Sequence, residues 1–382
     1  MFTPTRPPIL RVGIIRTSSI GDVVLSTACL DVLCRLGLSD QAIFIGMAPS
    51  LELVELSYPK VGLFDLKGAD SPRSKPFARA LEHLKNLHLI VDLQMNLRSR
   101  MLCRALKRTH GVSVYTIRKN AYSRGQMVMG SRFRRRTSPL PHETLYPSAL
   151  QYQAMVDGLL EALAKHLPTE VLDKMFGYEA RPHLPFWEEN FQAPWLQELK
   201  FGRWLAIAPG AAYEQKRAPV GVFKQILFGL KDRFKDKPAD EGLSLVFLGT
   251  VEERSLALKI FDQVEWPFSV LNLAGKLSLP QSQAVLRQSD AVLTNDSALA
   301  HIGEAVGTPA SILFGPTVEG FGFAPWRQDS ESFSADLGCR PCSKHGKNPC
   351  RFGDSLCFYK LDIEAIVQHL YENLTRERNK DG

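Results

Sequence analysis

Three short stretches of the sequence gather side chains that could bind phosphate or move a proton. Residues 17–22 read TSSIGD, residues 209–217 read PGAAYEQKR, and residues 294–301 read TNDSALAH. A carboxylate could accept a proton, a lysine could meet a phosphate as a point charge, and an arginine could reach two oxygens. Each stretch follows an apolar run, so we expect all three at the carboxyl ends of parallel strands, where open α/β sheets bind ligands.

The third stretch belongs to the clearest structural unit of the chain. The sequence predicts a buried strand at 291–293, a helix over 298–306 that starts after Asp296 and Ser297, and a second strand at 310–314. Strand, helix and strand in this order form a right-handed βαβ unit. Because the first turn of a helix has free N–H groups and a positive dipole end, we expect it to hold the phosphates of a nucleotide.

Each of these side chains also has an ordinary structural role open to it. Asp22 could cap the helix that follows it, since carboxylates are common in a first helical turn. Lys216 and Arg217 could form a solvated basic loop. His301 lies on the same side of its helix as Ser297 by i, i+4 spacing, yet a lone helical histidine is more often a satisfied surface or core residue.

Apolar periodicity places the three stretches within two series of strands and helices. The first series has predicted strands at 10–15, 42–45, 61–66, 89–93 and 112–115, and helices at 23–36, 51–56, 77–87, 97–107 and 149–163. The second series has further strands at 204–208, 243–248 and 270–273, and helices at 219–234, 252–261, 280–287 and, last, 363–370. Both series predict an α/β fold with a doubly wound parallel sheet.

Two regions fall outside this rhythm. Residues 118–141 lose periodicity and are rich in Gly, Ser and Arg, so they are predicted to be a mobile loop. Residues 167–197 carry four prolines with scattered aromatic residues and are the predicted domain boundary. A chain of 382 residues is too long for one ordinary core. We therefore expect two domains, 1–185 and 186–382.

Composition and charge narrow the class of protein. With 45% hydrophobic and 23% charged residues, no bilayer-spanning apolar run and no signal peptide, the chain is expected in the cytoplasm. The net charge is +7, and the positive charge is unevenly distributed along the chain. Residues 98–136 hold many Lys and Arg and no Asp or Glu. Such a block implies an acidic partner: nucleic acid, an anionic membrane surface or a phosphorylated substrate.

Four stretches together resemble a known family. RTSSIGDVVLSTACLDVL, VDLQMNLRSR, APGAAYEQKRAP and LTNDSALAHIGEAVGTPASILFGPT match, in order and spacing, motifs of glycosyltransferase family 9, the bacterial ADP-heptose:lipopolysaccharide heptosyltransferases. The resemblance implies a GT-B fold, with two Rossmann-like domains facing across a cleft. The first domain would take the lipopolysaccharide acceptor and the second the ADP-sugar, and the C-terminal helix would pack back on the first domain.

The resemblance also implies roles for individual residues. Asp22 matches the catalytic carboxylate, which would take the proton from the acceptor hydroxyl as it attacks the anomeric carbon with inversion. Lys216, with Arg217 beside it, matches the lysine that contacts the donor phosphates. The remaining donor-binding positions are Asp296, Ser297, Ala298 and His301 around the pyrophosphate, Glu252 (or Glu253) near the nucleoside, and Leu277 on the adenine.

Two positions depart from the family pattern. Ala218 stands where a Trp commonly follows the Lys-Arg pair, so the packing behind the phosphate loop would differ. Ala298 often appears as Gly in relatives, and alanine tolerates fewer backbone conformations near a phosphate. With a helical φ at Ala298, its amide could still donate.

The resemblance implies acidic partners for the basic residues at 98–136. Lipid A and Kdo carry phosphates and carboxylates, and the inner membrane surface is anionic. The expected acceptor-binding residues are Ser18, Ser19, Arg98, Arg118, Lys119 and Arg124. The protein is therefore expected to touch the inner face of the inner membrane transiently. Nucleic acid is not expected as a partner, since these basic residues lack interleaved aromatics and RNA-binding patterns. The resemblance implies transfer without a metal or cofactor, and no paired-carboxylate metal motif is present.

Alternatives in function and in cysteine chemistry stay open at this point. A non-catalytic nucleotide-sugar or anionic-glycolipid binding protein could use the same fold, whereas a nicotinamide-dependent oxidoreductase is disfavoured by the missing GxGxxG. The last four of the seven cysteines lie close in sequence, at Cys339, Cys342, Cys350 and Cys357. They are expected to be free thiols, with a structural zinc site or a labile disulfide as alternatives.

Overall fold

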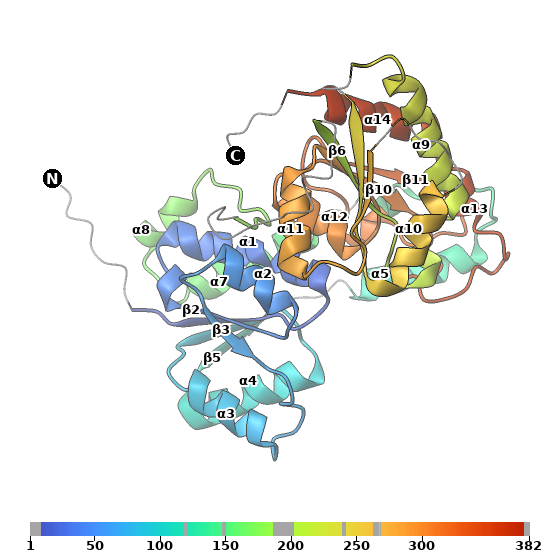
Figure 1. Ribbon diagram of the computed structural model, residues 1–382. Coiled ribbons are helices and arrows are strands. Elements are labelled where there is room, and N and C mark those ends of the chain that lie inside the picture. Colours follow the sequence, from blue (N-terminus) through green and yellow to red (C-terminus); the bar gives the residue numbers. More distant parts are fainter. Residues whose placement is uncertain are drawn as a thin grey trace. The chain divides into compact units, whose positions relative to one another are not determined.

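The computed structural model describes residues 9–117, 121–146, 150–185, 202–238, 242–262, 267 and 269–377. It divides the chain into two compact units (Figure 1). The N-terminal unit comprises residues 1–119 and 151–187, and the C-terminal unit comprises residues 120–150 and 188–382. Among the helices described, none is both long and apolar enough to cross a membrane.

The N-terminal unit is built on a five-stranded parallel sheet in the order β3-β2-β1-β4-β5. Its strands are β1 (Val12–Ile15), β2 (Ala42–Gly46), β3 (Gly62–Asp65), β4 (Leu89–Asp92) and β5 (Ser113–Thr116). Its helices are α1 (Ile20–Leu36), α2 (Ser50–Ser57), α3 (Lys75–Leu84), α4 (Leu97–His110), α7 (Gln151–Leu163) and α8 (Thr169–Leu172). Every residue of β1 and β4 is buried, and the strand order reverses between these two central strands.

The C-terminal unit repeats this plan with one more strand, in the order β11-β10-β9-β6-β7-β8. Its strands are β6 (Arg203–Ala208), β7 (Leu243–Phe247), β8 (Ser269–Asn272), β9 (Ala291–Asn295), β10 (Ala310–Phe314) and β11 (Glu331–Ser334). Its later helices are α9 (Val220–Phe234), α10 (Arg254–Phe261), α11 (Leu279–Gln288), α12 (Ala298–Ala305), α13 (Leu356–Tyr359) and α14 (Ile363–Thr375). Here the order reverses between β6 and β9, so this pair is the switch point where ligands bind in such sheets.

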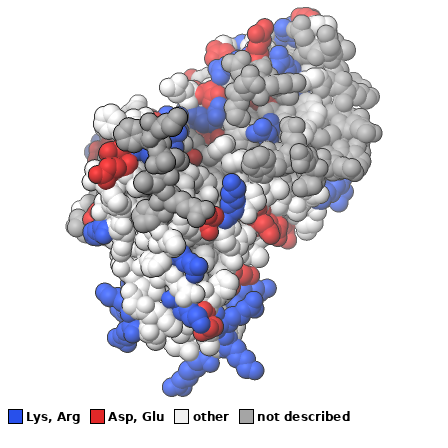
Figure 2. Space-filling view, turned by 90° about the vertical axis from the view of Figure 1, so that its left-hand side faces the viewer, with Lys and Arg blue, Asp and Glu red and all other residues white. Residues whose placement is uncertain are grey.

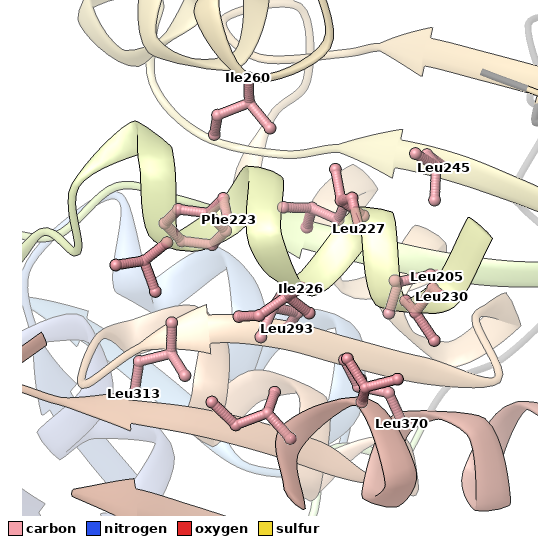
Figure 3. Close-up of a cluster of buried hydrophobic side chains, with 14 of the residues drawn as sticks. Leu205, Phe223, Ile226, Leu227, Leu230, Leu245, Ile260, Leu293, Leu313 and Leu370 are labelled. Atoms are coloured by element: carbon pink, nitrogen blue, oxygen red, sulfur yellow. The ribbon is translucent and has the colours of Figure 1, made fainter. Parts of the chain in front are cut away.

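The core of the C-terminal unit lies between its sheet and helices α9 and α14. Figure 3 shows Phe223, Ile226 and Leu227 of α9 turned toward sheet residues, with Leu370 of α14 on the same cluster. These side chains are fully buried. Each buried leucine or phenylalanine contributes about 1.5–3 kcal/mol, so this packing anchors the strands whose ends carry the candidate site.

The prediction of a mobile loop at residues 118–141 is wrong for most of that region. Residues 121–133 form helix α5 (Ala121–Phe133), and α6 (His142–Leu145) follows. The helix is held by bonds to residues far along the chain: Ser131 Oγ donates to the Pro341 carbonyl at 2.8 Å, and Arg134 Nη2 to the Arg340 carbonyl at 2.7 Å. Tertiary contacts outweigh weak intrinsic propensity here, which a single stretch of sequence does not reveal.

Those contacts also change the domain assignment of this segment. Residues 120–150 were expected in the first domain, but they pack with the C-terminal unit. The last helix, α14, packs on α9 and on β6, β9 and β10 of the C-terminal unit, because its buried face joins that unit's hydrophobic core. Its packing on the first domain stays a prediction.

Candidate functional site

An ion pair lies where the loops after β6 and β9 meet. These strands are parallel neighbours, with Ala208 opposite Thr294, so the residues that follow them come together at the carboxyl edge of the sheet. Lys216 Nζ is 2.6 Å from Asp296 Oδ2, and the two side chains are 15% and 10% exposed. Two of the sequence-predicted residues, 80 positions apart in the chain, therefore form one largely buried charged contact at the switch point.

The surroundings of Asp296 keep it ionised. Burial alone raises its pKa, but the Lys216 ammonium, the hydroxyl of Thr317 and the charge of His301 outweigh burial and hold the pKa of this carboxyl below its ordinary value. Thr317 Oγ1 donates to Asp296 Oδ2 at 2.7 Å. Thr317 follows β10, so three neighbouring strand ends contribute to the same carboxylate.

Asn295 fastens the two loops to each other. Its Nδ2 donates to the carbonyls of Pro209 and Gly210 at 2.7 and 3.2 Å, and its Oδ1 accepts from the amide of Ala218 at 3.0 Å. Asn295 was not singled out from the sequence, because its partners are set by which strands are neighbours. Ala218, the departure from the family pattern, is buried and gives this amide to the link.

Helix α12 begins at the same edge. Ser297, its N-cap, has an extended φ of −144°, and Ala298 is its first helical residue. Ala298 is therefore helical, the condition under which its amide points along the axis as a donor. Ser297 Oγ lies 3.1 Å from Thr294 Oγ1. The first-turn amides and the ammonium of Lys216 together make this edge suited to an anion.

One turn later, His301 is packed among aromatic rings. It is buried, and its ring stacks on Trp326 with centroids 5.8 Å apart and lies 6.1 Å from Phe323. Glu304, one turn further, accepts from the backbone amides of Trp326 and Arg327 at 2.9 and 3.1 Å. Burial raises the pKa of Glu304 to about 8. Glu304 thus fixes the loop that places Trp326 against His301.

The two candidate nucleoside carboxylates have different surroundings. Glu253 is buried, accepts from the Thr250 amide at 2.9 Å, and packs so closely on Gly210 that a Cβ there would lie 1.9 Å from its Oε1. Glu252 is exposed, and a hydrogen bond with Thr250 lowers its pKa. Glu253 is therefore a structural support of the loop, and Glu252 is the carboxylate that faces solvent.

The other two predicted donor residues also lie at this end of the unit. Arg217 donates from Nε and Nη2 to the Ala211 carbonyl at 3.1 and 3.0 Å, and its Nη2 is 3.7 Å from Glu253 Oε1. Its guanidinium braces the loop that carries Lys216. Leu277 is partly exposed in the turn before α11.

In the N-terminal unit, Asp22 occupies the first turn of α1. Its Oδ2 accepts from the amide and the hydroxyl of Ser19, each at 3.2 Å, and Arg16 Nη2 lies 2.6 Å away. The helix-capping role is thus present. The other oxygen, Oδ1, is buried and has no hydrogen-bond partner among the described residues. One oxygen is therefore held in place, and the other makes no hydrogen bond to the described part of the chain.

A second residue missed in the sequence, Gln94, joins the two loops of this edge. Its Oε1 accepts from the amides of Thr17 and Ser18 at 3.0 and 3.2 Å, and its Nε2 donates to Ser18 Oγ at 3.2 Å. Arg16 also donates to the Leu93 carbonyl. These bonds tie the loop after β4 to the loop after β1, which carries the exposed Ser18 and Ser19.

The described basic residues expected at the acceptor side belong to different units. Arg98 is paired with Asp70 in the N-terminal unit. Arg124 belongs to the C-terminal unit, where its guanidinium lies over the rings of Phe323 and Phe321 at 4.8 and 5.9 Å. Their assignment to the acceptor side stays a prediction. Arg118 and Lys119 lie outside the described residues.

The cysteines carry no bridge. All seven are free thiols, and burial raises the pKa of Cys342 to about 11 and that of Cys357 to about 12. Across the described ranges, no three His, Cys, Asp or Glu side chains form a group that could hold a metal ion.

The two sheets define a class of protein: an α/β protein made of two Rossmann-like units, with ligand sites expected at the switch points of such sheets. The chain belongs to glycosyltransferase family 9 (heptosyltransferase), whose model matches residues 77–351. It is therefore a glycosyltransferase, which sets aside the nicotinamide-dependent alternative.

Two curated relatives match over short stretches. Lipopolysaccharide heptosyltransferase 2 of Escherichia coli K12 is 31% identical over 87 residues, which are 22% of this chain and 24% of that protein. Lipooligosaccharide heptosyltransferase 2 of Haemophilus influenzae is 47% identical over 47 residues, 12% of this chain and 14% of that protein. The matched stretches thus span a quarter or less of these relatives.

Solved structures match over nearly the whole chain. The family 9 glycosyltransferase of Veillonella parvula superposes with a TM-score of 0.64 at 15% identity, covering 97% of this chain and 99% of that one. ADP-heptose lipopolysaccharide heptosyltransferase II of E. coli gives a TM-score of 0.61 at 18% identity, covering 96% and 98%. These matches confirm the predicted GT-B fold class.

Proposed function

We propose that the protein is an inverting heptosyltransferase that moves a heptose from an ADP-sugar to the inner core of lipopolysaccharide. The observation that carries the proposal is the largely buried Lys216–Asp296 pair beside the start of α12. Support also comes from structural relatives of the same family, since E. coli heptosyltransferase WaaC was solved with ADP and with ADP-2-deoxy-2-fluoro heptose.

The C-terminal unit would bind the donor. In this proposal Lys216 Nζ and the amides of Ser297 and Ala298 bind the diphosphate, and His301 lies next to it. Leu277 would pack on the adenine and Glu252 would accept from the ribose. As the sugar leaves, negative charge grows on ADP, and the lysine and the helix start offset it without a metal ion.

The N-terminal unit would supply the base. Asp22 Oδ1 accepts the proton of the acceptor hydroxyl while that oxygen attacks the anomeric carbon. The bond between the anomeric carbon and the phosphate oxygen breaks, its electron pair stays on ADP, and the configuration inverts. Arg16 and Ser19 hold the carboxylate through Oδ2, so that Oδ1 keeps its direction.

A substitution at Asp22 tests the base directly. Asp22→Asn keeps the shape but cannot take a proton, so we expect transfer to fall by about 10²–10⁴-fold, the usual contribution of a general base. ADP affinity, measured by calorimetry, should stay within twofold or so of the parent value, because the donor contacts lie in the other unit. Asp40→Asn, an exposed carboxylate of the same unit, is the matched control. Full turnover in the Asp22 variant would remove it as the base.

The donor is tested by a thermal-shift panel of ADP, UDP, GDP and their sugars. Binding of the native nucleotide to the folded state raises the melting temperature. We expect ADP and ADP-heptose to give the largest shifts. A donor-bound protein that transfers nothing to any lipopolysaccharide acceptor would instead favour the non-catalytic binding protein.

In this proposal the acceptor is anchored in a membrane. The N-terminal unit has a basic surface that could contact this membrane. Helices α3 and α4 are neighbours, and Figure 2 shows Lys and Arg side chains around the end of the unit that they form in Figure 1. The exposed basic residues on these helices and beside them are Arg73, Lys75, Arg79, Lys85, Arg100, Arg104, Lys107 and Arg108. We propose that this basic α3–α4 surface binds the anionic inner face of the inner membrane.

A further inference from the structure

A fully buried arginine grips the loop after β10. Arg340 is 0% exposed, and its guanidinium donates to three backbone carbonyls: Nε to Gly315 at 2.6 Å, Nη1 to Ala335 at 2.6 Å, and Nη2 to Thr317 at 2.8 Å. Charge-assisted bonds of this kind are what make a buried guanidinium tolerable. The Arg340 guanidinium therefore holds three backbone carbonyls in place.

The loop that Arg340 binds also forms a hydrogen bond with Asp296. The amide of Cys342 donates to the Pro316 carbonyl at 2.9 Å, so residues 340–342 hold three consecutive carbonyls, from Gly315 to Thr317. Thr317 in turn donates its hydroxyl to Asp296 Oδ2, the atom that binds Lys216. A continuous chain of bonds therefore runs from Arg340 through Thr317 and Asp296 to the Lys216 ammonium.

The same segment also touches the stem of Lys216. Gly346 has a left-handed φ of +69°, and a Cβ at this position would lie 2.4 Å from Lys216 Cγ and 2.9 Å from its Cδ. Lys347 follows, with its ammonium 5.2 Å from the ring centroid of Tyr213 in the lysine loop. The backbone at 346 thus lies directly on the lysine stem, and any side chain there would displace it.

We propose that Arg340 and Gly346 are positioning residues for Lys216, holding its ammonium where the donor diphosphate binds. Arg340 fixes the partner of the ammonium, and Gly346 confines the stem. The role of the diphosphate rests on the proposed function. The steric part does not, because it concerns contacts within this chain alone.

The first test compares two glycine variants by calorimetric titration with ADP. Gly346→Ala should weaken ADP binding by about tenfold, the size of one displaced charge-assisted hydrogen bond. Gly353→Ala is the matched control, because Gly353 has a φ of +75° in the same segment and open space around its Cβ. In a Lys216→Ala background, Gly346→Ala should have no further effect. An equal loss in that background, or no loss in the parent, overturns the proposal.

A second test needs no ligand. The rate at which an amine-acetylating reagent modifies Lys216, followed by mass spectrometry, should rise several-fold in Gly346→Ala and stay at the parent rate in Gly353→Ala. Arg340→Lys is a second variant, for use if Gly346→Ala does not fold. It keeps the positive charge but cannot bind all three carbonyls as the guanidinium does, so the same rise in the acetylation rate is expected. Equal rates in all variants contradict the positioning role. If the parent protein fails to bind ADP while the Lys216 rates still differ, the proposed function falls and the positioning role stands.

Discussion

Among the residues around α12, Glu304 is a buried carboxyl that keeps its proton into the neutral range. It faces the backbone amides of Trp326 and Arg327, the Arg327 charge and the hydroxyl of Ser330. Burial is the larger influence and raises its pKa from 4.5 to about 8. The folded chain therefore binds a proton that the unfolded chain releases, and this carboxyl lowers stability as the pH rises between those two values.

Glu304→Gln should remove that pH dependence. The amide has the shape of the protonated acid and keeps an acceptor for both backbone amides. Its free energy of unfolding, relative to the parent, should therefore increase from pH 4.5 to about pH 8. Urea denaturation across this range measures it. A constant difference between the two proteins would mean that folding does not raise the pKa of Glu304.

The contribution of Asp296 to stability should show the opposite dependence on pH. Its pKa is lower in the folded state than the ordinary value of 3.8, so its stabilising contribution is present above that value and disappears as the pH falls through the folded pKa. Asp296→Asn leaves Lys216 without its ionic partner and should cost about 3 kcal/mol at neutral pH. The deficit should shrink in acid, below pH 3.8, when measured by denaturation of both proteins. A deficit independent of pH would contradict a charge-based role.

At this scale the sequence located the charged residues but not their partners. Lys216, Asp296 and Ser297 were found because each lies in a polar loop that follows an apolar strand, which is a local pattern. Asn295 and Gln94 were missed because their bonds reach 85–86 and 76–77 positions along the chain. Such partners depend on which strands become neighbours, and that is decided by the packing of the whole sheet.

At the scale of elements, α5 depends on bonds to a distant segment. Arg134 donates from Nε to the Gly338 carbonyl at 3.0 Å and from Nη2 to the Arg340 carbonyl at 2.7 Å. Helix α5, which ends just before Arg134, carries two glycines and two serines within 13 residues, and these weaken it as an isolated helix. Its order therefore comes from the C-terminal unit that it joins.

Arg134→Ala should loosen this helix selectively. Two charge-assisted bonds are lost, and a cost of about 1.5–3 kcal/mol is expected. Amide hydrogen exchange in residues 121–133 should accelerate while exchange in α9 stays slow. Arg132→Ala, at an exposed arginine in the last turn of α5, is the control. Equal protection of α5 in both variants would show that other contacts hold it.

The elements predicted from periodicity are those with strong local signals. The strands at 291–295 and 310–314 and the helix between them appear where apolar spacing and caps indicate them. The strand β11 and helix α5 carry weak apolar patterns, and their formation rests on neighbours supplied by the fold. Periodicity therefore predicts the framework of each sheet better than the segments attached at its edges.

At the scale of the whole molecule, the basic α3–α4 surface gives a test of membrane contact. Replacing Arg104 and Arg108 by Glu should weaken binding to vesicles of phosphatidylcholine with about one third phosphatidylglycerol, by about 2 kcal/mol or more, since each basic residue near an anionic surface contributes about 1 kcal/mol. Sedimentation with vesicles measures it, and added salt should weaken parent binding.

The control variant reverses the charge of Arg254 and Lys259, which are exposed on α10 of the other unit. It should bind the anionic vesicles as the parent does. Equal losses in both variants would mean that net charge alone drives the contact. Binding of the parent to pure phosphatidylcholine vesicles would point to an apolar contact in its place.

The path of the chain between the two units bears on how it folds during synthesis. Residues 120–150 leave the first unit, join the second, and the chain then returns. The bond from Ser131 to Pro341 spans 210 positions. On the ribosome, α5 must therefore emerge long before its binding site exists, and neither unit can be released as one uninterrupted fragment with all of its own elements.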